Sequence, residues 1–226
     1  IEEGYDTAPI DGQVLTANIE DVTSLNVSSK NIADLTGIES FTALTELFCE
    51  FNQLTSLDVS NNTALTNLGI FENQLTSLDV SNNIALTDLI CANNQLTSLD
   101  VSNNIALTAL ICENNQLTSL DVSNNIALTD LFCRNNQLTS LDVRNGNNTN
   151  ITTFNATTNP DLTCIYVDDI DYSTTNWTEI DPASTFVENE AECSALYTAI
   201  PDSNFEQALI EEGYDTAPID GQVLTA

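Results

Sequence analysis

LTELFCEFNQLTSLDVSNNTA, residues 44–64, sets a pattern that the rest of the chain repeats. It contains two similar halves, the first reading L-x-x-L-x-C-x-x-N and the second L-x-x-L-x-V-x-x-N. Residues two apart on a strand face the same side, so Leu47 with Cys49, and Leu57 with Val59, are predicted to point into a core. The segment therefore predicts two short strands, one in each half.

The stretch NQLTSLDVSNN recurs with a period of 21 residues from Asn52 through Asn136. One leucine register marks the repeat at Leu54, Leu75, Leu96, Leu117 and Leu138, and a second at Leu57, Leu78, Leu99, Leu120 and Leu141. Self-similarity at this period is the signature of a solenoid, and 21 residues leave little room for a full helix in each coil. We expect coils stacked at the strand spacing of about 4.8 Å.

The repeated pattern from Leu44 to about Val143 resembles the bacterial leucine-rich-repeat family, in particular its class with nested 21-residue periodicity. The preceding VTSLNVSSKNIADLTGIESFTAL resembles the 22-residue repeat of internalins. The fold class that we predict is a β-rich leucine-rich-repeat solenoid, a flattened coil with short parallel strands on both sides, few helices and a small helical cap. The resemblance implies a bacterial secreted or cell-surface protein that functions in binding or adhesion.

The sequence IEEGYDTAPIDGQVLTA occurs at residues 1–17 and again, letter for letter, at 210–226. In the second copy it follows IPDSNFEQAL, where Asp202 or Ser203 can cap a helix that Gly213 ends. The simplest interpretation is that the sequence is a fragment of a tandem array. A designed or circularly shifted chain is the alternative. We expect a partial N-terminal cap at 1–21, an internalin-like first repeat at 22–43, the 21-residue repeats at 44–143, degenerate repeats and a disulfide-closed C-terminal cap at 144–196, and the start of the next unit's cap at 197–226.

Charge excludes several classes of partner. The chain has 34 acidic and 3 basic residues, with a formal net charge of −31. Such a surface repels phosphate backbones and anionic membranes, so we expect no nucleic acid as partner. The apolar runs are too short to span a bilayer, so we expect no membrane insertion. Soluble cations or a salty extracellular medium suit this charge, and solubility alone also explains it.

The second half of each repeat predicts an outward row of Ser-Asp-Ser, with carboxylates at Asp58, Asp79, Asp100, Asp121 and Asp142. Mutual repulsion of the carboxylates can be relieved by the flanking serines or by bound calcium, which prefers oxygen ligands. A solvated structural face is the alternative. The acidic loop with Asp168, Asp169 and Asp171 is open to the same two interpretations. We otherwise expect no cofactor.

The first half of each repeat varies at its outward positions, as expected if the frame is structural and this face carries specificity. Its members include apolar residues flanked by acids and by one arginine: Phe48, Phe71, Ile90, Ile111, Phe132, Glu46, Asp88, Asp130 and Arg134. Glu50, Ala92 and Glu113 are expected to point outward at the position that Phe71 and Arg134 occupy in their coils. An exposed apolar stripe of this extent suggests a contact surface for a protein, a glycan or another copy of the chain. Drift of exposed strand residues with high β-propensity is the alternative.

The six cysteines form two groups. Cys49, Cys91, Cys112 and Cys133 occupy an inward position of the repeat where one coil has Ile70, which favours packing as small buried hydrophobes. Cys164 and Cys193 lie apart from these, and we expect a disulfide between them that closes the C-terminal end, consistent with an extracellular location. Trp177 is expected to cover the last coil.

The sequence offers no catalytic constellation. Histidine is absent, and neither a Ser-His nor a Cys-His pair can form. No glycine-rich phosphate loop occurs. We therefore expect a non-catalytic module of a larger tandem-array surface protein, acting as a structural or adhesive fibre or stalk. The alternatives are a receptor-like module that binds a protein or glycan on the variable face, and a targeting appendage of a secreted enzyme.

Overall fold

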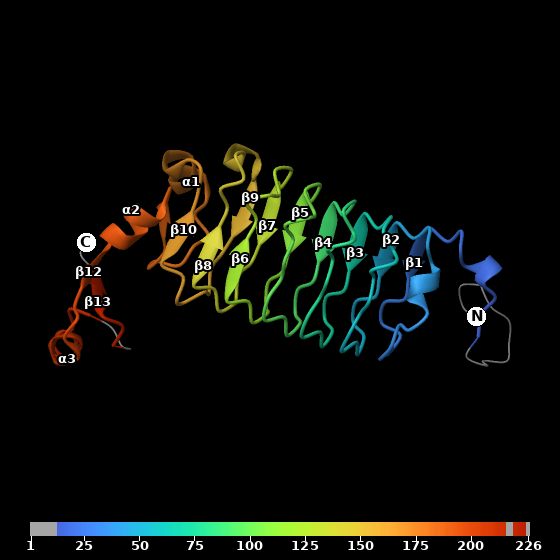
Figure 1. The fold of residues 1–226 in the computed structure, drawn as a ribbon, viewed down its shortest axis with the longest axis horizontal. Helices are drawn as coiled ribbons and strands as arrows, with labels where there is room; N and C mark the ends of the chain where they lie inside the picture. Colours follow the sequence, from blue (N-terminus) through green and yellow to red (C-terminus); the bar gives the residue numbers. More distant parts are fainter. Residues whose placement is uncertain (1–12, 216–218, 225–226) are drawn as a thin grey trace. The chain divides into compact units, whose positions relative to one another are not determined.

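The computed structural model describes residues 13–215 and 219–224, and it divides the chain into two compact units, Ile1–Phe186 and Val187–Ala226. Most of the predicted partial cap at 1–21 lies in residues 1–12, outside the described residues. The first unit is a right-to-left succession of coils in Figure 1, each coil lying against the next. The predicted parallel-strand solenoid is confirmed.

One sheet runs along the whole solenoid and contains the variable half of every repeat. Its strands are parallel and lie in the order β1-β2-β3-β4-β5-β7-β9. Equivalent residues of successive coils are paired, as Leu47 with Leu68 and Leu89 with Leu110. The strands are β1 (Ser24–Asn26), β2 (Glu46–Phe48), β3 (Asn67–Gly69), β4 (Asp88–Ile90), β5 (Ala109–Ile111), β7 (Asp130–Phe132) and β9 (Thr153–Asn155).

The predicted second sheet forms only in the later coils. It has the order β11-β10-β8-β6, built from β6 (Ser119–Asp121), β8 (Ser140–Asp142), β10 (Cys164–Tyr166) and β11 (Thr185–Val187). In the earlier coils the Ser-Leu-Asp segments are not strands, and Leu57 there is only half-buried. The coils are thus joined by a parallel strand ladder on the variable side throughout, and by a second ladder on the Ser-Asp side only from β6 onward.

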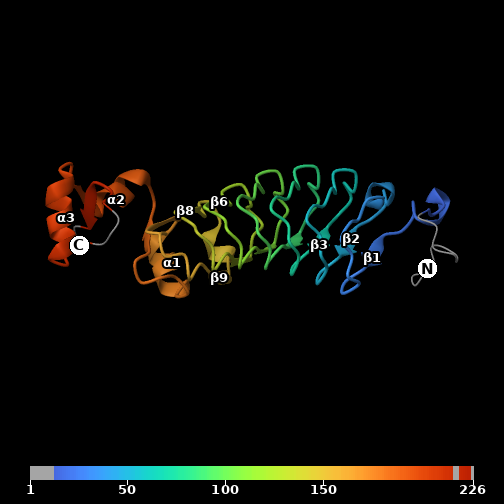
Figure 2. The ribbon, with the colours of Figure 1, turned by 90° about the horizontal axis from the view of Figure 1, so that it is seen from below.

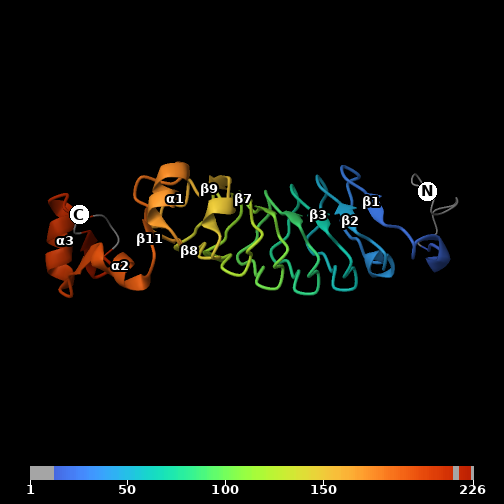
Figure 3. The same cartoon turned by 90° about the horizontal axis from the view of Figure 1, so that it is seen from above.

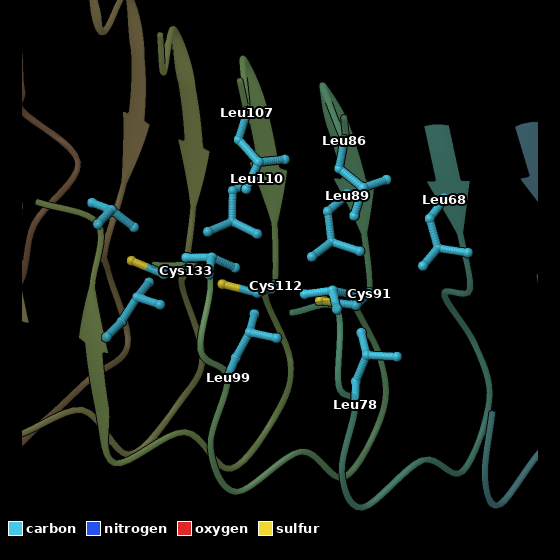
Figure 4. Close-up of a cluster of buried hydrophobic side chains, with 14 of the residues drawn as sticks. Leu68, Leu78, Leu86, Leu89, Cys91, Leu99, Leu107, Leu110, Cys112 and Cys133 are labelled. Carbon is cyan, nitrogen blue, oxygen red and sulfur yellow. The ribbon is translucent and has the colours of Figure 1, made fainter. Parts of the chain in front are cut away.

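The core of the first unit is a stack of leucines from the two predicted registers and from the centre of each strand on the variable side. Leu68, Leu89 and Leu110 are at most 1% exposed. Cys91, Cys112 and Cys133 lie in one row among them (Figure 4), and all four cysteines of the repeat are buried and free. They therefore pack as small hydrophobes, as the exchange with Ile70 predicts. Figures 2 and 3 show the coils edge-on, side by side along the unit.

A column of buried asparagines fixes the turn after each strand of the variable side: Asn52, Asn73, Asn94, Asn115 and Asn136. The Nδ2 group of Asn94 donates to the carbonyls of Ile70 and Cys91, and its Oδ1 accepts the N–H of Leu75. The residue before each of these asparagines has a positive φ of 53–56°. The asparagines satisfy the backbone groups that the bend leaves unpaired, as the sequence predicts.

Aromatic side chains close the C-terminal end of the first unit. Trp177, 2% exposed, stacks on Phe154 of β9 with ring centroids 4.4 Å apart, and its Nε1 donates to the carbonyl of Ile151. Helix α1 (Ile170–Asn176) precedes this tryptophan, and the Asp169 carboxylate caps it by accepting the N–H of Tyr172. Trp177 thus covers the last coil as predicted.

The second unit contains α2 (Glu190–Ala195), β12 (Tyr197–Ala199), α3 (Ser203–Glu211) and β13 (Gln222–Leu224). Strands β12 and β13 are antiparallel. Asp202 caps α3 by accepting the N–H groups of Asn204 and Phe205, so the predicted helix is present. Cys164 and Cys193 are disulfide-bonded, which confirms the predicted bridge. Among the described residues, no helix is long and apolar enough to cross a membrane.

Candidate binding face

The outward residues of the long sheet form two aligned columns, which we call the variable face. Register places Phe48, Gly69, Ile90, Ile111, Phe132 and Asn155 in one column, and Glu46, Asn67, Asp88, Ala109, Asp130 and Thr153 in the other. Most of these side chains are half-buried, because each lies against its neighbours in the adjacent coils. The column of the expected apolar stripe runs over six strands, but the buried Gly69 interrupts it and the polar Asn155 ends it.

The acids of this face are held by neighbouring polar groups. The Asp88 carboxylate accepts the hydroxyl of Thr87 at 2.7 Å and the Nδ2 group of Asn67 at 3.0 Å. Asp130 accepts the hydroxyl of Thr129 in the same way. Because these carboxylates already have partners and fixed orientations, they offer a partner preorganised acceptors rather than mobile charges.

The N-terminal end of the variable face is aromatic, and here the sequence analysis was incomplete. Phe51, 53% exposed, was not among the predicted residues, and its ring meets Phe71 edge-on at 4.6 Å. Glu50 was expected to point outward, but it is 9% exposed because its carboxylate bends over Gly69 and accepts the hydroxyl of Ser28. A Cβ at Gly69 would lie 2.1 Å from the Glu50 Oε1 atom, so only glycine leaves room for this carboxylate.

Ala92 was also expected to face outward, but it is 4% exposed. It occupies the same place as Glu50 in its coil, on the turn between a strand and the buried asparagine. The N–H of Glu72 in the preceding coil donates to the Ala92 carbonyl at 3.1 Å, which joins this turn to that coil. The equivalent Phe71 and Glu113 are half-buried and Arg134 is exposed, so the burial at this position differs from coil to coil.

The C-terminal end of the variable face is a shallow hollow of about 330 Å³ lined by Ile111, Glu113, Phe132, Arg134 and Asn155. Arg134 Nε donates to Glu113 Oε2 at 2.7 Å, and the arginine side chain is 49% exposed. Glu113 therefore fixes the guanidinium of Arg134 beside the Phe132 ring. An apolar floor with one oriented arginine suits a partner that presents both apolar and acceptor groups.

The Ser-Asp row is ordered by hydrogen bonds within each coil. Asp58, Asp79 and Asp100 each accept the N–H of the serine two residues later, all at 2.9 Å. Hydrogen bonds from Ser81 lower the pKa of Asp79, and this effect exceeds the repulsion from Asp58. At the end of β8, Arg144 pairs with Asp142 at 2.5 Å. The serines therefore stabilise the charged carboxylates.

The described residues contain no group of three or more histidine, cysteine, aspartate or glutamate side chains placed to hold a metal ion. A hollow of about 230 Å³ nevertheless separates Asp100 from Asp121, at the point where the second sheet begins. Calcium binding along the Ser-Asp row, or at Asp168, Asp169 and Asp171, stays a prediction.

Comparison with known proteins gives relatives for the repeat region. Internalin J of Listeria monocytogenes serotype 4b (strain F2365) is 51% identical over 41 residues, which are 18% of this chain and 4% of that protein. The solved functional domain of InlJ from Listeria monocytogenes, described as including a cysteine ladder, is 40% identical with a TM-score of 0.53, covering 68% of this chain and 32% of that one. An internalin, InlF, from Listeria monocytogenes str. 4b F2365 is 28% identical with a TM-score of 0.60, covering 73% of this chain and 48% of that one.

No family model matches the chain. The chain spans only a small part of the curated relative and less than half of each solved internalin. The similarity therefore covers part of each relative, and the fold that it shows is the leucine-rich-repeat solenoid.

Proposed function

Because this chain belongs to the bacterial leucine-rich-repeat family, we propose that it is a non-catalytic, extracellular module of a tandem-array surface protein, serving as a structural and adhesive unit of a fibre or stalk. The observation that supports this most is the identity of residues 1–17 with residues 210–226. A solenoid needs caps at its ends, and an array of capped solenoids gains reach and avidity from its copies.

The described residues of the second copy are bonded to the segment that precedes them, which supports a cap. Glu206 of α3 is 1% exposed, and its Oε1 atom accepts the N–H groups of Asp220 and Gly221. The helix thus holds the Asp-Gly turn of the repeated stretch, while β12 pairs with its strand β13. Both partners of this stretch come from residues 197–209, so the repeating unit includes the segment that precedes Ile210.

In the first copy, the residues equivalent to Val223 and Leu224 are Val14 and Leu15. Val14 is 38% exposed and Leu15 is 73% exposed. We expect that adding a copy of residues 196–209 before Ile1 completes a cap there and raises the melting temperature by several degrees, because about 1–2 kcal/mol shifts the melting temperature of a domain of this size by about that much.

Differential scanning calorimetry measures this shift. The matched control is the same extension with alanine at the positions of Asp202 and Glu206, which cap the helix and hold the Asp-Gly turn. An extended chain that melts no higher than the control contradicts the tandem cap. Coding sequence that continues with further 209-residue units supports the array, while an adjoining catalytic domain supports the targeting appendage instead.

A second candidate function is a receptor-like module that binds a protein or glycan on the variable face. The aromatic end with Phe51 and Phe71, and the hollow beside Phe132 and Arg134, favour it, because aromatic and arginine side chains dominate binding energies at interfaces.

We expect Phe132→Asp to weaken binding of such a ligand at least tenfold while the melting temperature changes little, since the side chain is half-buried at the edge of the hollow. Gln116→Asp, which adds the same charge on an exposed turn, is the control. Glycan arrays and host-protein pull-downs, followed by titration of each hit, measure the effect. A ligand bound equally by both variants does not use this face.

A further inference from the structure

Three isoleucines project from the solenoid outside the variable face. Ile84, Ile105 and Ile126 occupy the same position in successive coils and are 62%, 56% and 57% exposed. They lie on the turn that leads from the Ser-Asp row to the next strand of the variable face. We call them the isoleucine ridge. The coil before the ridge has Thr63 at this position and the coil after it has Asn147.

The backbone beneath the ridge is fixed. The neighbouring residues Asn83, Asn104 and Asn125 are fully buried. Asn104 Nδ2 donates to the carbonyls of Val80 and Asn83 in the preceding coil, at 3.0 and 2.9 Å. Each isoleucine is thereby held in register with the next coil. A partner that contacts the ridge therefore loses little free energy to ordering of the backbone.

The ridge lies in an uncharged part of a strongly acidic molecule. Residues 80–87, 101–108 and 122–129 contain no charged side chain, although the net charge of the chain is −31. Asn82, Asn103 and Asn124 beside the ridge donate to serine carbonyls of the preceding coil. Two copies of the chain repel each other over most of their surfaces, and they can approach with the least repulsion along this strip.

A second copy also matches the ridge in shape. It presents the same isoleucines at the same spacing, about 4.8 Å from coil to coil, so two ridges can interdigitate along their length. Three isoleucines expose far less than the roughly 800 Å² per partner that a stable dimer buries. A single pair of ridges therefore gives weak contact, and several pairs in linked units give avidity.

We propose that the isoleucine ridge is a lateral contact between copies of this chain, by which neighbouring fibres or stalks associate. The avidity of this contact rests on the tandem-array function, whereas the pairwise contact exists in a single chain. Because salt screens the repulsion between acidic surfaces but leaves apolar contact intact, association is expected to increase with ionic strength.

Sedimentation equilibrium of the full chain at rising concentration, in 0.05 and 0.5 M NaCl, tests this proposal. The ridge variant is Ile84→Thr, Ile105→Thr and Ile126→Thr together, which uses the residue that the chain itself has at Thr63. We expect weak self-association of the wild type that is at least tenfold weaker in the ridge variant and unchanged in Phe132→Asp. The converse change, Thr63→Ile, lengthens the ridge by one coil and is expected to strengthen association severalfold.

Equal association of the wild type and the ridge variant would overturn the proposal, as would a wild type that stays monomeric up to millimolar concentration in high salt. Loss of association in Phe132→Asp instead assigns the contact to the variable face and also overturns it. None of these outcomes depends on the cap-extension experiment, so failure of the ridge contact is distinguishable from failure of the tandem array. Melting temperatures of the variants confirm that each is folded.

Discussion

Replacing Asn115 by alanine is expected to lower the free energy of unfolding by about 3–5 kcal/mol. Its Nδ2 group donates to the carbonyls of Cys91 and Cys112 at 3.1 Å, and its Oδ1 atom accepts the N–H of Leu96 at 3.0 Å. The side chain is 8% exposed. Alanine leaves these backbone groups buried without a partner, and each such group costs about 1–3 kcal/mol.

The effect is large because the asparagine connects coils. One partner, Cys112, lies in its own coil, and the other two, Leu96 and Cys91, lie in the coil before. One substitution therefore weakens the interface between adjacent coils, on which the stability of a solenoid depends. Urea denaturation followed by Trp177 fluorescence and by far-ultraviolet circular dichroism measures the change.

The control is Gln116→Ala at the adjacent exposed position, which keeps the backbone bond from Gln116 N–H to the Leu96 carbonyl. It is expected to change stability by no more than about 0.5 kcal/mol. A loss below about 1 kcal/mol in Asn115→Ala would show that water replaces the asparagine, and would contradict the structural role of the column.

Alkaline pH is expected to destabilise the protein through its buried thiols. Burial raises the pKa of Cys49, Cys91 and Cys133 to about 12, and burial together with the neighbouring thiols raises the pKa of Cys112 well above its usual range. In the unfolded chain the thiol pKa is about 8.5. Between these values the unfolded state has released the thiol protons and the folded state has not.

The direction in which the free energy of unfolding changes with pH follows from proton linkage. The folded state binds more protons than the unfolded state between about pH 9 and 12, so the free energy of unfolding falls as the pH rises through this range. Each thiol contributes about 1.4 kcal/mol per pH unit there, and the four together about 5 kcal/mol per unit. Below the unfolded pKa the thiols are neutral in both states and contribute no pH dependence.

Urea midpoints at pH 7, 9 and 10 measure this slope. Cys112→Ala removes one of the four thiols, and it is expected to be less stable at pH 7 but to lose about a quarter less stability per pH unit above pH 9. Because the comparison uses the slope and not the absolute stability, titration of Lys30 and the tyrosines cancels between the two proteins. Equal slopes in both proteins would contradict the prediction.

The sequence alone determined most of the fold. A 21-residue period requires every coil to follow the same path, so the leucine registers, the buried cysteines and the asparagine column could be read from spacing. The cap helix followed from Asp202 and Gly213, and the disulfide from two cysteines outside the repeat. The leucines, cysteines and asparagines depend on a position shared by all coils, which is visible in one repeat. The cap helix and the disulfide depend on residue types outside the repeats.

Only the tertiary structure decided how unlike side chains of adjacent coils meet. Glu50 turns inward because Gly69, one coil away, leaves space for its carboxylate, and Arg134 is oriented because Glu113 lies beside it. The second sheet is confined to the later coils, where the Ser-Asp segments come within hydrogen-bonding reach. The isoleucine ridge is apolar, yet the turn directs Ile105 to solvent. Such features arise between residues about 21 apart, and their outcome depends on the distance between coils, which the repeat pattern does not specify.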